Sequence, residues 1–191
     1  LCYIQHMKIN QLLMKTCIAG MLLAGCTTTD QSGMEQKDPL KAYKNLPEEN
    51  RYRLLEDDSL KAKVENGTGI IVMAQKNEDD SPYAVYAVHD LLETYDMSAG
   101  YYEVVNEKDP SIVSLVKNNL SGGTFYVDDD VSCPLVLFVQ KGEIVNLFDD
   151  DYFEDHPSYA VPQLQKAMES MQLYLEDQKV DACDEGCQLG G

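Results

Sequence analysis

Short apolar runs alternate with segments of helical periodicity along most of the chain, and this alternation predicts a mixed α/β domain. Residues 70–74 form a continuous apolar run, which suits a strand that is buried on both faces. Strands are expected at residues 50–56, 70–74, 101–105, 134–140 and 144–148, with a break at Gly100 and a tight turn at 141–143. Helices are expected from residue 58 or 59 to 65, from 81 to 95, from 109 to 116, and after Pro157 and Pro162.

Two of these segments have the pattern of an amphipathic helix. Ser81 can cap the first of them, and Pro82 suits its first turn. Its apolar stripe consists of Tyr83, Ala84, Ala87, Val88, Leu91, Leu92 and Tyr95. The last helix has one apolar side, made of Leu164, Ala167, Met168, Met171 and Leu175. Each of the two helices is therefore expected to bury one face.

The first part of the chain has the composition of a targeting segment. From Met7, the expected translation start, a short apolar run follows a lysine and ends in small residues before Cys26. Residues 1–25 are interpreted as a signal peptide, and 23–26 resemble the lipobox in which the cysteine is lipidated. An ordinary secretory signal, in which Cys26 has no special role, is the alternative. We expect residues 26–47 to be a lipidated N-terminus and flexible tether, with the protein anchored in the cell membrane and facing outside the cytoplasm.

The charge of the chain restricts its partners. The net charge of −18 becomes −20 once residues 1–25 are removed, because that segment holds two lysines and no acidic residue. Such an excess excludes nucleic acid as a partner and leaves membrane attachment to the anchor. Three groups of carboxylates stand out: Glu78, Asp79 and Asp80; Asp128, Asp129 and Asp130; and Asp149, Asp150 and Asp151. These groups are either independent solvated loops or a surface that binds cations or a basic peptide. None of them has the spacing of a calcium-binding loop, and the sequence predicts no metal or cofactor.

The order of the elements between residues 50 and 177 resembles the thioredoxin fold. Two local features carry the resemblance: S-P-Y-A at 81–84 matches the inner positions of C-P-x-C, and Cys133-Pro134 precedes a strand and a hairpin. The chain is most similar to bacterial thioredoxin-like proteins, including the bacteriocin-transport accessory type. The resemblance implies a central mixed sheet flanked by helices, with a C-terminal hairpin and helix, over residues 48–177. It also implies a cis bond at Pro134, Cys133 near Ser81, and all three carboxylate groups at one end of the sheet.

The resemblance also implies a loss of chemistry. Ser81 and Ala84 stand where the family has its two redox cysteines, and residues 70–74 lack the acidic residue that members often bury there. A serine hydroxyl stays protonated at neutral pH, so two-cysteine exchange is not expected. Ser81 as a hydrolytic nucleophile would need a base, and His89 is interpreted as a surface or boundary residue. The expected function is a membrane-anchored binding or adaptor module that holds an extended peptide segment beside Pro134.

The remaining cysteines leave a competing function open. Cys133 is either a buried small hydrophobe or a lone reactive thiol, and nearby acids would raise its pKa. Cys183 and Cys187 lie in a tail, residues 178–191, where they form either a small structural disulfide loop or a redox pair. The alternative function is therefore a thiol-disulfide oxidoreductase that works through Cys133 or through the Cys183/Cys187 pair.

Overall fold

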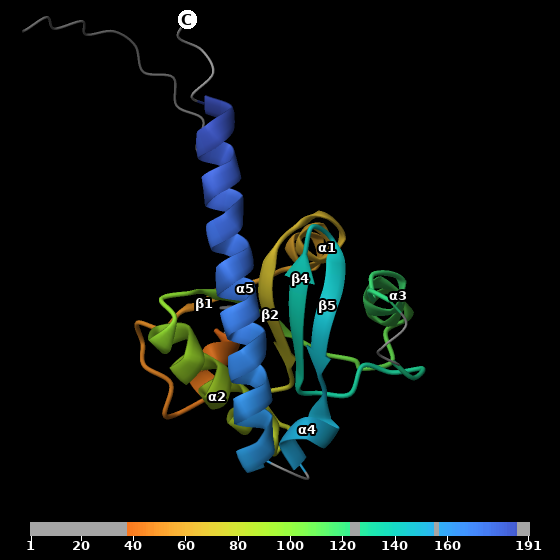
Figure 1. Cartoon of the computed structure of the whole chain (residues 1–191). Coiled ribbons are helices and arrows are strands. Elements are labelled where there is room, and N and C mark those ends of the chain that lie inside the picture. The colour runs from red at the N-terminus through yellow and green to blue at the C-terminus, as the bar shows by residue number, and fades with distance from the viewer. Residues whose placement is uncertain (1–37, 123–126, 155–156, 187–191) are drawn as a thin grey trace, which may run out of the picture. The chain divides into compact units, whose positions relative to one another are not determined.

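The computed structural model describes residues 38–122, 127–154 and 157–186. Figure 1 shows the strands and helices of this part of the chain. The strands are β1 (Tyr52–Leu54), β2 (Gly69–Ala74), β3 (Ala99–Glu103), β4 (Leu135–Gln140) and β5 (Glu143–Phe148). The helices are the 3-10 turn η1 (Pro39–Ala42), α1 (Asp57–Asn66), α2 (Ser81–Thr94), α3 (Pro110–Asn118), α4 (Asp150–Glu154) and α5 (Pro157–Gly186).

The five strands form one mixed sheet in the order β1-β3-β2-β4-β5. β1, β3 and β2 run parallel, β4 pairs antiparallel with β2, and β5 pairs antiparallel with β4. Lys141 and Gly142 turn the final hairpin with φ of 50° and 83°, the backbone that a two-residue hairpin loop requires. This topology, with helices on both faces of the sheet, is the thioredoxin-like fold that the sequence predicts.

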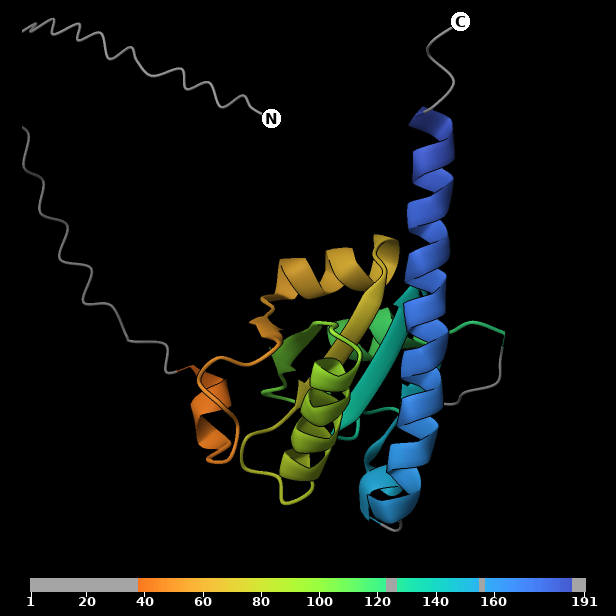
Figure 2. The same ribbon diagram turned by 60° about the vertical axis from the view of Figure 1, so that its left-hand side comes forward.

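Strand alternation divides the interior into two cores. On β2, Ile70 faces the core beneath α2 and α5, while Ile71 faces the core beneath α1 and α3. The antiparallel register sets Phe138 opposite Ile70 and Leu137 opposite Ile71, so β4 contributes to both cores in the same alternation. Every residue of β2 is buried, as the continuous apolar run predicts. Figure 2 shows the two helix layers on either side of the sheet.

β3 begins two residues earlier than the sequence pattern indicates, and Gly100 lies inside the strand instead of breaking it. A Cβ at Gly100 would come within 2.4 Å of the Leu55 side chain, so the glycine permits close packing of the segment after β1. The strand ends at Glu103, and Val105 beyond it is 90% exposed. The expected break at Gly100 is therefore wrong.

The folded part begins before the expected boundary at residue 48. Asp38 caps η1 by accepting a hydrogen bond from the backbone N–H of Leu40. Leu40 and Tyr43 are buried in the core beneath α2, so the segment from Asp38 onward packs on the domain and is not a tether. Cys26 and the rest of the predicted signal and lipobox lie outside the described residues.

The C-terminal region differs from the expectation in two ways. α4 follows β5 directly, and α5 begins at Pro157, so that Pro162 lies inside the helix. Pro162 removes one hydrogen bond near the helix start, where it is exposed to water, and the buried Leu164 and Met168 hold the next turns on the sheet. The helix continues to Gly186, so Cys183 belongs to α5 and not to a separate tail; Cys187 lies outside the described residues.

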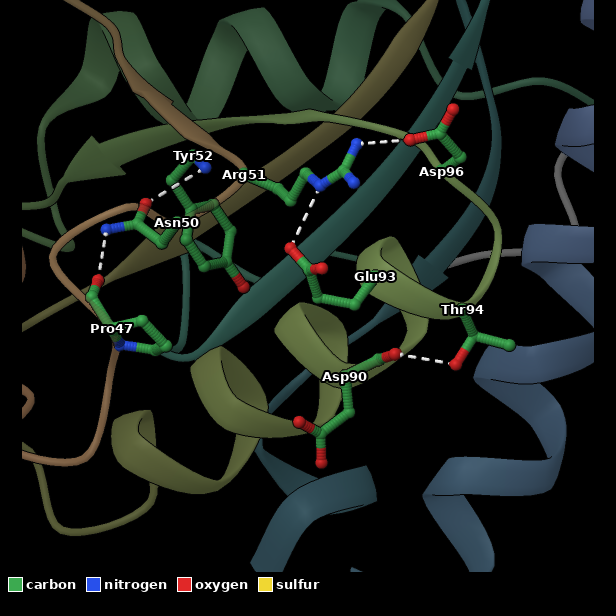
Figure 3. A network of polar contacts seen from close by, with 8 residues as sticks. All are labelled: Pro47, Asn50, Arg51, Tyr52, Asp90, Glu93, Thr94 and Asp96. Atoms are coloured by element: carbon green, nitrogen blue, oxygen red, sulfur yellow. Dashed lines mark hydrogen bonds and ion pairs between the residues drawn. The ribbon is translucent and has the colours of Figure 1, made fainter.

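Arg51, directly before β1, forms ion pairs at the C-terminal end of α2. The Nε of Arg51 donates to Glu93 at 2.9 Å, and its NH1 group donates to Asp96 at 2.6 Å (Figure 3). On the same segment, the Asn50 side chain accepts from the backbone N–H of Tyr52 and donates to the Pro47 carbonyl.

Among the helices that the structure describes, none combines the length and apolar character needed to cross a membrane.

Candidate functional site

Three loops meet at one end of the sheet. α2 starts after the carboxyl end of β2, β4 starts at that same end because it is antiparallel to β2, and β5 returns there before α4. Figure 2 shows the start of α2 and the short helix α4 at this end, with α1 at the opposite end. The structure therefore brings S-P-Y-A, the Cys133-Pro134 bond and α4 to one end of the fold.

Ser81 does not cap α2 as predicted. Asp80 occupies the capping position and Ser81 is the first helical residue, with its side chain completely buried. The hydroxyl of Ser81 lies near that of Tyr43, yet it forms no hydrogen bond with any residue that the structure describes. A buried serine hydroxyl without a partner, beside a tyrosine and not a histidine, is not an activated nucleophile.

The other positions of S-P-Y-A have separate environments. Pro82 lies in the first turn, as expected. Ala84 is fully buried in the core, whereas Tyr83 is 58% exposed and does not belong to the buried stripe. Val85 is buried instead. The exposed Tyr83 ring thus offers an apolar contact at this end of the sheet.

Cys133 and Pro134 adopt the expected backbone, with a cis peptide bond between them. Cys133 is a free, buried cysteine. Its thiol lies 3.6 Å from the carbonyl oxygen of Val131, and its backbone N–H donates to Glu107 Oε1 at 3.0 Å. Burial raises the pKa of the Cys133 thiol, and the carboxylates of Glu107, Asp150 and Glu78 raise it further.

A chain of buried hydroxyls lies beneath the start of α2. The hydroxyls of Tyr43 and Tyr101 are 3.0 Å apart, and Tyr101 donates to Glu103 at 2.7 Å. Burial, together with the charge of Glu103, raises the pKa of Tyr43 to about 12. Ser81 begins α2 after the carboxyl end of β2, and Cys133 precedes β4, which is antiparallel to β2, so the topology places both residues at the same end of the sheet.

Two of the three carboxylate groups have a member close to Cys133 at this end of the sheet. Glu78 follows β2 and Asp150 starts α4, and both act on the Cys133 thiol. Burial raises the pKa values of Asp149 and Asp150, and the neighbouring carboxylates of this group raise them further. Asp129, in contrast, lies 3.4 Å from Lys117 of α3, so the 128–130 group is partly directed toward that helix.

Sequence reasoning missed three residues at this end: Tyr43, Glu103 and Glu107. Leu40, Tyr43 and Leu46 recur at threefold spacing in a polar segment, which could have indicated an ordered N-terminal turn. Glu103 and Glu107 carry no local signal, because their partners are set by the fold. Among the residues that the structure describes, no group of His, Cys, Asp or Glu has the arrangement of a metal site.

Comparisons with known proteins reach only the level of the fold. No family model matches the chain, and no curated protein matches it. The solved structures that match include one described as an oxidoreductase with a thioredoxin fold, its activity assigned provisionally. The match covers 61% of this chain and 93% of the other, at 19% sequence identity and a TM-score of 0.44. The thioredoxin-like assignment of this chain therefore rests on its own strand order and helix placement.

Proposed function

We propose that this protein is a non-catalytic binding module that holds an extended peptide segment beside Pro134. The observation that carries the proposal is the pairing of two features at one end of the sheet. The start of α2 has a buried serine and a buried alanine in place of a cysteine pair, and the facing thiol of Cys133 is buried among carboxylates. Thiol–disulfide exchange needs an accessible thiolate, and this environment disfavours one.

The same end has features suited to binding without covalent chemistry. Tyr83 is exposed in the first turn of α2, and Tyr152 of α4 is 40% exposed, its ring contacting Phe148 at 5.2 Å. Such rings can contribute apolar contact area at little conformational cost. Glu78 and Asp151 are exposed near them, so the surface favours a segment that carries Lys or Arg.

We also propose that the domain is attached to the outer side of the cell membrane through lipid on Cys26. The lipobox-like residues 23–26 and the polar residues that follow support this attachment. Labelled palmitate should enter the wild-type protein in intact cells, and C26A should prevent it. Wild-type protein that takes up no lipid and is found free in the medium would contradict the anchor.

The competing function is a thiol-disulfide oxidoreductase acting through Cys133 or through Cys183 and Cys187. It shares the fold and the location, so binding alone does not separate the two. An insulin-reduction assay does, because the oxidoreductase would accelerate reduction and the binding module would leave the background rate unchanged. Loss of any acceleration in C133A would assign it to that thiol.

Charge variants test the binding proposal. Replacing Glu78 with Gln and Asp150 with Asn should weaken binding of a Lys/Arg-rich peptide about three- to tenfold, and high salt should reduce the difference. Replacing Asp128, Asp129 and Asp130 together with Asn should weaken binding in the same direction. The matched control replaces Asp58 with Asn and Glu65 with Gln in α1, at the opposite end of the sheet, and should change nothing. Equal affinity for acidic and basic peptides would reject the basic partner.

A further inference from the structure

Glu107 occupies the backbone donors that precede Pro134. The backbone N–H of Val131 donates to the main-chain oxygen of Glu107 at 2.9 Å. Two residues on, the N–H of Cys133 donates to the side-chain Oε1 of the same glutamate at 3.0 Å. Glu107 therefore accepts hydrogen bonds from the N–H groups of both Val131 and Cys133, the donors that a paired strand would otherwise engage in this segment.

We infer that the Glu107 carboxylate is an internal occupant of the peptide position, which a bound segment must displace from Cys133. The inference rests on the proposed function, since it concerns the same end of the sheet. An extended peptide gains affinity mainly from main-chain hydrogen bonds, and its carbonyl would need the N–H that Glu107 already holds. The peptide and the carboxylate compete for one donor.

The charge of Glu107 selects the peptide that can displace it. The carboxylates of Glu78 and Asp150 lie close enough to act on the same thiol, so a released Glu107 carboxylate remains among like charges. A Lys or Arg side chain on the incoming segment would pair with Glu107 as it leaves Cys133. A neutral segment offers no such pair, so Glu107 excludes neutral peptides more strongly than basic ones.

Two substitutions separate occupancy from charge. E107A removes the acceptor and the charge, whereas E107Q keeps an amide oxygen that can accept from Cys133 but removes the charge. E143A, in β5, is the control because Glu143 is exposed at the start of that strand. The full chain is titrated with two extended octapeptides, one neutral and one with a central Lys, and hydrogen exchange of the Cys133 amide is followed in parallel.

The inference predicts a distinct result for each variant. E107A should bind the neutral peptide about fivefold more tightly than wild type. E107Q should lie between the two, because its neutral amide oxygen accepts from Cys133 more weakly than the carboxylate does. Both variants should show a weaker preference for the Lys peptide than wild type, because Glu78 and Asp150 still favour a basic segment. E143A should behave as wild type. The Cys133 amide should exchange slowly in wild type and E107Q, rapidly in free E107A, and slowly again when E107A binds the peptide.

The titrations also separate a failure of the role of Glu107 from a failure of the binding function. If wild type and E107A bind the neutral peptide equally, the role of Glu107 is overturned while the binding function stands. If neither peptide binds wild type or any variant, the proposed function fails and takes this inference with it.

Discussion

The hydroxyl groups of Tyr43 and Tyr101 lie 3.0 Å apart in the core, although 58 residues separate them in the chain. Tyr43 follows the turn η1, and Tyr101 lies in β3 beneath α2. Their rings also meet edge to face, with centroids 6.0 Å apart. This contact ties the N-terminal segment to the end of the fold where we place binding.

Removing one hydroxyl measures that contact. Y43F should lower the free energy of unfolding by about 1 kcal/mol, because it deletes a buried hydrogen bond and keeps the ring. Y83F is the matched control and should have no measurable effect, since Tyr83 is largely exposed. Urea unfolding followed by circular dichroism gives both values. Equal stability of Y43F and wild type would show that the hydroxyl pair contributes nothing.

Alkaline pH should destabilise the fold. The pKa of Tyr43 and that of Tyr102 are raised to about 12, from about 10 in the unfolded chain. Between these values the unfolded state loses protons that the folded state keeps, so the stabilisation is complete below pH 10 and is lost as pH approaches 12. The free energy of unfolding should therefore fall with rising pH across this interval, and it should fall less steeply in Y43F, which lacks one of the two hydroxyls.

Alkylation tests the environment of Cys133. Iodoacetamide should modify this thiol slowly in the native protein at pH 8, because burial and nearby carboxylates raise its pKa. E107Q should react several-fold faster, since it removes the carboxylate that acts most strongly on the thiol. Peptide-resolved mass spectrometry separates Cys133 from the other cysteines, and E143A serves as the control. A fast native reaction that E107Q leaves unchanged would contradict this description.

The ion pairs of Arg51 with Glu93 and Asp96 can be tested by replacing the arginine with lysine. R51K should lower the melting temperature by about 2 °C or less, because lysine cannot pair with Glu93 and Asp96 as a planar fork. High salt should reduce the difference between R51K and wild type. The control R53K should match wild type, since Arg53 is exposed. A large loss would mean that Arg51 has a role in packing that the ion pairs do not explain.

Much of the fold follows from local patterns. The continuous run at β2 and the apolar face of α5 require burial, so periodicity alone places them. The strand order follows from the resemblance, because periodicity does not determine which strands pair. The start of β3 does not follow from the local pattern. Gly100 looks like a break in the sequence, but it lies inside the strand because a side chain there would meet Leu55, 45 residues away in the sequence.

The candidate site was only partly accessible from the sequence. The positions of Ser81, Cys133 and Pro134 followed from the resemblance, but their partners did not. Tyr43 and Glu107 reach the site through contacts over 58 and 26 residues, and nothing near either residue marks such a contact. Serine is a residue type that often caps helices, so the sequence favours Ser81 at the N-cap of α2. In the structure Asp80 occupies the N-cap position, and Ser81 is the first residue of the helix and is buried.

The non-catalytic binding role is tested most directly with a Lys/Arg-rich peptide that contains its own disulfide, titrated into the isotope-labelled full chain. Non-covalent binding at this site should shift the amide signals of Ser81, Tyr83 and Cys133 in the nuclear magnetic resonance spectrum, while the peptide's disulfide stays intact. Release of free thiols from the peptide, or a mixed disulfide at Cys133, would contradict the non-catalytic role. Saturation of the chain with no shift at these three residues would contradict the binding site itself.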